Sequence, residues 1–161
     1  AERMRRAHAA LAERGLPLAS NQVQYHLLHR QIETDGILDT AKELGITIIA
    51  WSPLGSGLLT GKFHKDPEVL KKTPFGRRAM LGRQIESSRE LVAALDEIAE
   101  AHQVTTAQVA LNWLVNFHGD TVAAIPGASK VHHASESAGA MDFVLNEDEM
   151  ARIDELSRQF R

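Results

Sequence analysis

The order of hydrophobic and polar residues divides the chain into helical segments and short apolar runs. Apolar side chains recur at helical spacing over residues 3–14, 32–44, 86–102, 105–117, 131–139 and 146–157. Short apolar runs, typical of buried strands, occupy residues 18–25, 46–52 and 121–125. Because helices separate these runs, the strands are expected to be parallel, with right-handed crossovers. The pattern predicts an α/β fold with three parallel strands.

Polar residues at fixed spacing mark where two of these helices begin. Thr105 precedes Gln108 by three positions, and Asn146 precedes Glu149 by the same spacing. Each pair fits a capping box, in which both side chains bond the free backbone amides of the first turn. Gly45 follows the apolar face of an earlier helix and is expected to end it.

Residues 53–84 interrupt this regular order. The segment contains Pro67 and Pro74 among basic residues and is too long for a simple connection. We expect an irregular, mobile loop over a functional site.

A glycine-rich stretch follows the second strand. The apolar run ends at Trp51, and Gly55, Gly57 and Gly61 then allow backbone amides to approach an anion closely. Lys62 adds a positive charge suited to phosphate. The alternative is an ordinary turn with no ligand.

The third strand ends in a similar way. After Ile125, the chain breaks at Pro126 and Gly127, and Ser129 and Lys130 open the next helix. A hydroxyl and an ammonium at a helix N-terminus suit a dianionic phosphate.

Three segments carry a resemblance to a known family. Asn21-Gln22-Val23-Gln24-Tyr25, Trp51-Ser52-Pro53-Leu54 and Ile125-Pro126-Gly127-Ala128-Ser129 resemble the sixth, seventh and eighth strands of an aldo-keto reductase, in the right order. The resemblance covers nearly the whole chain. It implies that residues 1–161 form the C-terminal, NADP-binding half of a (β/α)8 TIM barrel, that is, a partial barrel. A complete barrel needs ~250 residues, and the family's catalytic Asp, Tyr, Lys and His lie on the first four strands, so no catalytic residue is assigned here.

The resemblance assigns two residues to the nicotinamide end of the cofactor. Trp51 would stack on the ring and expose one face for hydride transfer, and Gln22 would hydrogen-bond the carboxamide. The alternatives are a core aromatic residue and a polar residue at a strand end. The residues implied to line the pyrophosphate are Ser52, Pro53, Leu54 and Ser56, with Lys62 as charge partner or, alternatively, as a solvated surface lysine.

The resemblance assigns the adenosine end to the third strand exit. Gly127, Ser129 and Lys130 stand where the family holds the 2′-phosphate, which favours NADP(H) over NAD because charge-assisted hydrogen bonds are strong. Further along this helix the family pattern expects Gln or Arg, then Glu, then Asn. This chain has His133, Glu136 and Ser137. Glu136 fits the family pattern, whereas His133 and Ser137 differ from it, so the resemblance predicts weaker binding of the adenine.

The composition of the chain indicates which kinds of partner it is not expected to bind. With 161 residues, 43% hydrophobic content and a net charge of -3, the chain is expected to be one soluble domain that binds neither nucleic acid nor a membrane. The absence of cysteine favours a cytoplasmic protein. No metal site is expected, because the pairs His26 with His29 and His132 with His133 lack a third ligand. Tyr25, the single tyrosine, lies on the wrong strand for the family's catalytic acid.

Three functions remain open at this point. The first is the cofactor-binding half of an NADP(H)-dependent reductase that, as a complete barrel, converts a small-molecule carbonyl substrate to an alcohol by hydride transfer. The second is a non-catalytic nucleotide-binding half-barrel, and the third an inactive truncated fragment. Open strand edges near Gln22 and Ala123, and exposed apolar side chains on the 46–50 strand, predict self-association or pairing with a complementary half-barrel.

Overall fold

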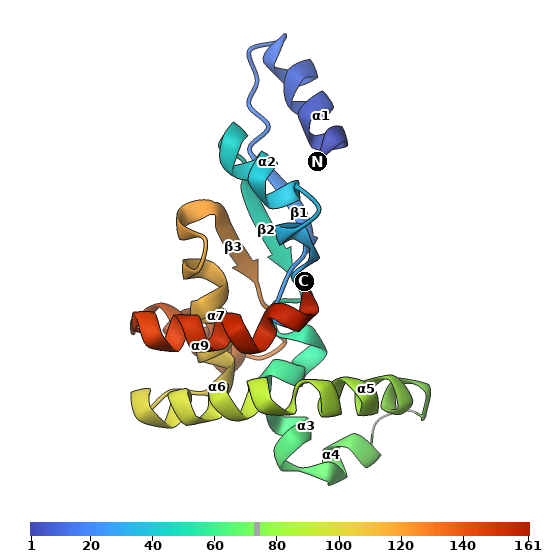
Figure 1. Cartoon of the computed structure of the whole chain (residues 1–161), viewed down its shortest axis with the longest axis vertical. Coiled ribbons are helices and arrows are strands. Elements are labelled where there is room, and N and C mark those ends of the chain that lie inside the picture. The colour runs from blue at the N-terminus through green and yellow to red at the C-terminus, as the bar shows by residue number, and fades with distance from the viewer. Residues whose placement is uncertain (73–74) are drawn as a thin grey trace.

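A three-stranded parallel sheet lies at the centre of the computed structural model, which describes residues 1–72 and 75–161. The strands β1 (Ser20–Gln24), β2 (Thr47–Trp51) and β3 (Val122–Ile125) are ordered β1-β2-β3 and do not close into a barrel (Figure 1). The register places Gln22 beside Ile49 and Ile49 beside Ala123. The predicted set of three parallel strands is confirmed, with each strand between one and three residues shorter than expected.

Helices cover one face of this sheet, and further helices extend beyond it at both ends. In Figure 1, α1 lies beside α2 at one end of the molecule. At the other end lie α3 (Lys62–Lys65), α4 (Pro67–Lys71) and α5 (Phe75–Ser87). Helix α7 packs against β3, and α6 packs against both α7 and α9. Their bounds are α1 Glu2–Ala12, α2 Ile37–Leu44, α6 Arg89–His102, α7 Thr106–Asn116, α8 Val131–Ala138 and α9 Glu147–Ser157.

The main hydrophobic core lies between the sheet and these helices. Ile48 and Ala50 point into it from β2 and are fully buried, as is Trp113 of α7. The expectation that the apolar side chains of strand 46–50 are exposed is therefore wrong for these two residues and for Ile46, because they lie on the helix-covered face. On the other face of β2, the ring of Trp51 is 41% exposed.

The capping boxes form as predicted. Thr105 and Gln108 cap α7, and Asn146 and Glu149 cap α9, each through reciprocal hydrogen bonds of side chain and backbone. Gly45 ends α2 in the left-handed conformation, with φ 65°.

Two helix starts differ from the prediction. Residues Gln31–Glu33 form a separate 3-10 turn, η1, and α2 begins only at Ile37, because Gly36 adopts φ 82° and breaks the helix. The helix expected from residue 86 begins at Arg89, because the two residues Glu86 and Ser87 belong to the preceding helix.

The prediction of an irregular loop over 53–84 is wrong. The segment contains η2 (Gly55–Thr60), α3 (Lys62–Lys65), α4 (Pro67–Lys71) and α5 (Phe75–Ser87). Pro67 starts a helix instead of breaking one, because it occupies the first turn after the capping residue Asp66. These helices pack a second small core, formed by Leu58, Phe63 and Leu81. Pro74 lies outside the described residues.

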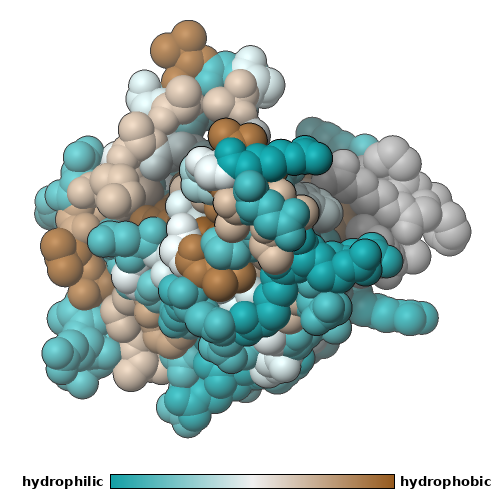
Figure 2. Space-filling view, turned by 90° about the horizontal axis from the view of Figure 1, so that it is seen from above, coloured by the Kyte–Doolittle hydropathy of each residue, from teal (hydrophilic) through white to brown (hydrophobic). Residues whose placement is uncertain are grey.

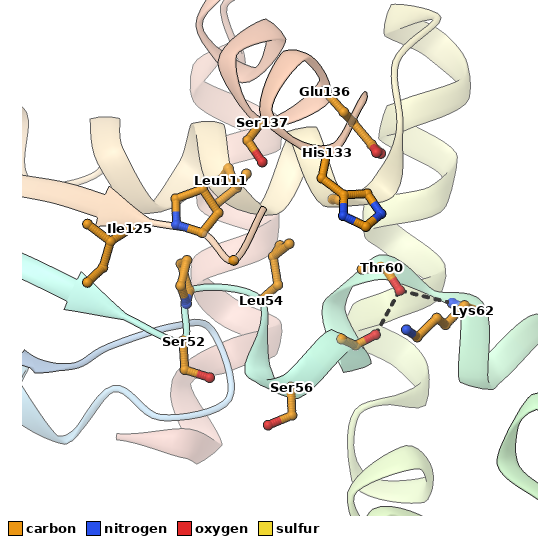
Figure 3. A pocket seen from close by; sticks show the side chains of 15 residues that line it. Ser52, Leu54, Ser56, Thr60, Lys62, Leu111, Ile125, His133, Glu136 and Ser137 are labelled. Atoms are coloured by element: carbon orange, nitrogen blue, oxygen red, sulfur yellow. Dashed lines mark hydrogen bonds between the residues drawn. The ribbon is translucent and has the colours of Figure 1, made fainter. Parts of the chain in front are cut away.

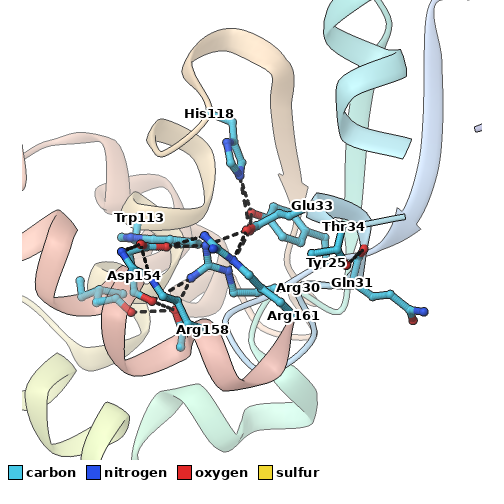
Figure 4. Close-up of polar contacts among 12 residues, drawn as sticks. Tyr25, Arg30, Gln31, Glu33, Thr34, Trp113, His118, Asp154, Arg158 and Arg161 are labelled. Atoms are coloured by element: carbon cyan, nitrogen blue, oxygen red, sulfur yellow. Dashed lines mark hydrogen bonds and ion pairs between the residues drawn. The ribbon is translucent and has the colours of Figure 1, made fainter. Parts of the chain in front are cut away.

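A buried ion network ties the chain after β1 to the C-terminal helix (Figure 4). Arg30 is fully buried, and its guanidinium contacts Glu33 at 2.8 Å and Asp154 of α9 at 2.6 Å. Tyr25 donates to Glu33 at 2.6 Å, and Arg161 also reaches both carboxylates. Each buried charge is therefore paired, as burial requires.

The surface is mostly hydrophilic when viewed from the α1 end, with separate hydrophobic patches (Figure 2). Large apolar residues that remain exposed are Leu16, Trp51, Ile125, Val131, Met141 and Val144. Among the described residues, no helix has the length and hydrophobicity needed to cross a membrane.

Candidate functional site

A cavity of about 730 Å³ opens where β2 and β3 end. Its walls are the loop after β2, the end of β3 and helix α8, with α7 beneath them. The carboxyl ends of parallel strands are where such folds bind ligands, because the loops that follow them converge there. Of the predicted site residues, the cavity brings together Ser52, Pro53, Leu54, Ser56, Lys62, Gly127, His133, Glu136 and Ser137.

The loop after β2 has a strained backbone. Ser52 and Ser56 both adopt φ 55°, a left-handed conformation that costs a non-glycine residue ~1–3 kcal/mol. The turn closes through hydrogen bonds from the Gly55 amide to the Ser52 carbonyl, at 2.9 Å, and from the Gly57 amide to the Leu54 carbonyl, at 3.0 Å. Such strain persists only where the surroundings hold it, and it concentrates at binding sites.

Lys62 lies against the backbone of this loop. Its ammonium nitrogen is 4.9 Å from the centre of the Phe63 ring. A Cβ atom added to Gly57 would be 3.2 Å from that nitrogen, and Gly57 has φ 90°, so glycine gives the lysine room. The Thr60 hydroxyl donates to the Gly57 carbonyl at 2.7 Å. The positive charge is thus placed at one wall of the cavity.

Helix α8 supplies the opposite wall. His133, Glu136 and Ser137 face the loop that carries Leu54 and Thr60 (Figure 3). In the same view, the Ser52 and Ser56 hydroxyls point away from α8. Polar side chains therefore reach the cavity mainly from α8 and from Lys62.

Four predicted site residues lie outside the cavity lining. Ser129 and Lys130 are exposed just before α8, and the Ser129 hydroxyl oxygen is 3.5 Å from Nδ1 of His133. Gln22 and Trp51 lie on the exposed face of the sheet. Since Trp51 is 41% exposed, the alternative of a core aromatic does not describe it.

The chemistry of these donors fits a ligand that carries phosphate groups. Lys62 in the cavity and the exposed Lys130, just before α8, supply positive charge, and the cavity also presents serine and histidine side chains. Glu136 is an acceptor on the α8 wall and suits an amino group.

Within the described part of the chain, neither proton donation by Tyr25 nor binding of a metal ion is supported. Tyr25 is fully buried, and burial together with its hydrogen bond to Glu33 raises its pKa far above 10.0, so it is a poor proton donor. Within residues 1–72 and 75–161, no group of three or more His, Cys, Asp or Glu side chains could hold a metal ion.

Sequence reasoning missed several residues of the cavity wall. Ala107 and Leu111 come from α7, where they continue an ordinary apolar helix pattern and carry no signal of a ligand. Thr60 lies in the segment expected to be an irregular loop. The remaining lining residues, Gly57, Ile125 and Pro126, lie in the two strand exits that the sequence had singled out for other reasons.

Comparison with known proteins identifies the family. Residues 1–158 match the model of the aldo/keto reductase family. A pyridoxal reductase of Arabidopsis thaliana chloroplasts is 39% identical over 153 residues, which cover 94% of this chain and 40% of that protein. The aldo-keto reductase yakc [NADP(+)] of Schizosaccharomyces pombe is 32% identical over 143 residues, covering 86% of this chain and 42% of that protein.

A solved structure agrees with these matches. The crystal structure of a thermostable aldo-keto reductase with the inhibitor epalrestat superposes with a TM-score of 0.64 and 30% identity, covering 92% of this chain and 43% of that one. The chain thus spans less than half the length of the relatives it matches. With both its sequence and its partial barrel fold matched, the chain belongs to the aldo/keto reductase family.

Proposed function

We propose that residues 1–161 are the C-terminal, NADP(H)-binding part of an aldo-keto reductase. The observation that carries this proposal is the cavity at the ends of β2 and β3, which gathers residues from both glycine-containing strand exits. The name of the yeast relative includes NADP(+), and the plant relative is named for a carbonyl-containing substrate, pyridoxal. The complete enzyme would reduce a small carbonyl compound to an alcohol.

The residues of this chain would bind and orient the cofactor, which itself supplies the hydride. Lys62 would neutralise the pyrophosphate, and Lys130 with Ser129 would hold the 2′-phosphate at the edge of the cavity. Glu136 would accept a hydrogen bond from the adenine amino group. Trp51 would cover one face of the nicotinamide, and Gln22 lies on the same face of the sheet.

The alternative is a nucleotide-binding half-barrel without activity of its own, and the position of Tyr25 favours it for the chain in isolation. This single tyrosine is buried and hydrogen-bonded to Glu33, away from the cavity lining. General acid catalysis needs a donor within reach of the substrate oxygen. We therefore expect the purified chain to bind NADPH without oxidising it when simple aldehydes are added.

Equilibrium titration of the purified chain with NADPH and NADH tests the binding function. A charged hydrogen bond to the 2′-phosphate contributes ~1.5–3 kcal/mol, so NADPH should bind roughly 10- to 150-fold more tightly. Equal affinities would refute the assignment of the 2′-phosphate. No binding of either nucleotide by a folded chain would refute the proposal, and aldehyde-dependent NADPH oxidation abolished by Tyr25→Phe would refute the inactive alternative.

A further inference from the structure

The chain that leaves β1 touches the loop that forms the cavity. His26 follows β1 and is only 5% exposed. A Cβ atom added to Gly55 would lie 3.4 Å from both Cε1 and Nδ1 of the His26 ring, so the imidazole packs against the backbone of Gly55. Gly55 has φ 55° and lies between two residues of the cavity lining, Leu54 and Ser56.

Hydrogen bonds fix the orientation of this imidazole. The backbone amide of Leu28 donates to Nδ1 at 3.2 Å, and the side-chain amide of Gln24 lies 3.2 Å from Nε2. A neutral ring that accepts through Nδ1 carries its proton on Nε2. The Leu28 hydrogen bond thus orients the ring, and its Cε1–Nδ1 edge is the part nearest Gly55.

The neutral form of the ring is favoured by its surroundings. Burial, and to a smaller extent the charge of the nearby His29, lowers the pKa of His26 to about 4. The imidazole therefore accepts the Leu28 hydrogen bond at neutral pH, where a protonated ring would not.

We propose that His26 is a positioning residue that holds the strained 52–57 turn in its ligand-binding shape by packing beneath Gly55. Two of the turn's residues, Ser52 and Ser56, have left-handed backbones that the surroundings must maintain. The contact couples the end of β1 to the cavity wall, so the turn keeps its shape before any ligand binds. The effect on cofactor affinity rests on the proposed function, whereas the effect on the turn does not.

Amide hydrogen exchange of the full 161-residue chain tests this role without a ligand. The amides of Gly55 and Gly57 donate the hydrogen bonds that close the turn. In His26→Ala they should exchange at least about tenfold faster, because a loss of turn stability equal to one ordinary hydrogen bond has about this effect. The amides of β2 should keep their rates. The matched control is His8→Ala, which removes a histidine from α1, at the other end of the molecule from η2.

Two outcomes would overturn the proposal: unchanged exchange of the two turn amides, or acceleration of these and the β2 amides by the same factor, which would indicate a purely structural role. If His26→Ala does not fold, His26→Asn provides the same comparison, since its side-chain oxygen can still accept from Leu28 while the ring is lost. NADPH titration of the same variants should show weaker binding for the His26 variants alone. Failure of the unaltered chain to bind NADPH would count against the proposed function and leave the exchange result to decide the role of His26.

Discussion

If the cavity binds a nucleotide as proposed, two lysine side chains are expected to decide which one it accepts. Lys130 is the residue just before α8, has an extended backbone with φ -137°, and is exposed, as is Ser129. The loop wall across the cavity carries a second ammonium, that of Lys62. The two lysines are therefore expected to serve different phosphates, and substitutions can separate their roles.

Replacing Lys130 should weaken NADPH binding selectively. In Lys130→Ala, the loss of a charged hydrogen bond should cost ~1.5–3 kcal/mol of binding free energy for NADPH, with little change for NADH, which has no 2′-phosphate. Calorimetric titration measures both. Lys72→Ala, at an exposed position after α4, removes the same charge as a control. Equal losses for the two nucleotides would contradict the assignment.

Tyr25 should contribute to stability and not to binding. Its hydroxyl donates to Glu33 at 2.6 Å, so Tyr25→Phe leaves one lone pair of a buried carboxylate without that donor. Loss of a hydrogen bond to a charged group should lower the free energy of unfolding by ~1.5–3 kcal/mol in urea titrations. NADPH affinity should stay as it is, and a loss of affinity with unchanged stability would place Tyr25 in the binding site.

The sequence correctly predicts those helices and strands that depend on interactions between neighbouring residues. The strands and the capping boxes at Thr105 and Asn146 are confirmed because apolar runs and caps act over a few neighbouring residues. The helices of 53–84 were missed because they depend on contacts between distant residues, such as Leu58 with Leu81. The contribution of α7 to the cavity wall was also missed. Ala107 and Leu111 look like ordinary core residues until the positions of β3 and α8 are known.

Of the contacts between helices, the one between η1 and α9 should lower the free energy of unfolding most when it is lost. Arg30→Met leaves the carboxylates of Glu33 and Asp154 without their shared buried partner, which should cost ~3–5 kcal/mol of unfolding free energy. The control Arg152→Met breaks an exposed ion pair between α9 and Glu97 of α6 and should cost at most ~1 kcal/mol. Similar losses for the two variants in urea denaturation would show that the buried network is not the stronger contact.

The same network should make stability depend on pH. Burial alone would raise the pKa of Glu33, but hydrogen bonds from its neighbours outweigh it and hold the pKa well below 4.5, and Asp154 is likewise held below 3.8. A carboxyl whose pKa is lower in the folded state stabilises the fold above its unfolded pKa and loses this contribution as pH falls. The free energy of unfolding should therefore decrease steadily below about pH 5, and a flat profile from pH 7 to 3 would contradict this account.

For the whole molecule, the open sheet is the feature with the largest consequence. Within the described residues, β1 and β3 each pair with β2 on one side only, and Trp51 and Ile125 are 41% and 46% exposed. Unpaired strand edges and exposed apolar side chains favour association. Sedimentation velocity should therefore detect self-association that increases with concentration. A monomer at all concentrations, with slow amide exchange on all three strands, would show that the sheet is stable without a partner.

Nuclear magnetic resonance of the isotope-labelled chain tests the proposal that the two strand exits together bind NADP(H). On addition of NADP+, the account predicts that amide signals move in two separate segments, residues 52–62 and 125–137, which line the cavity from opposite sides. Signals of α1, at the far end of the molecule, should stay in place. Movement in one segment without the other, or equal movement throughout the chain, would show that the two strand exits do not form one binding site.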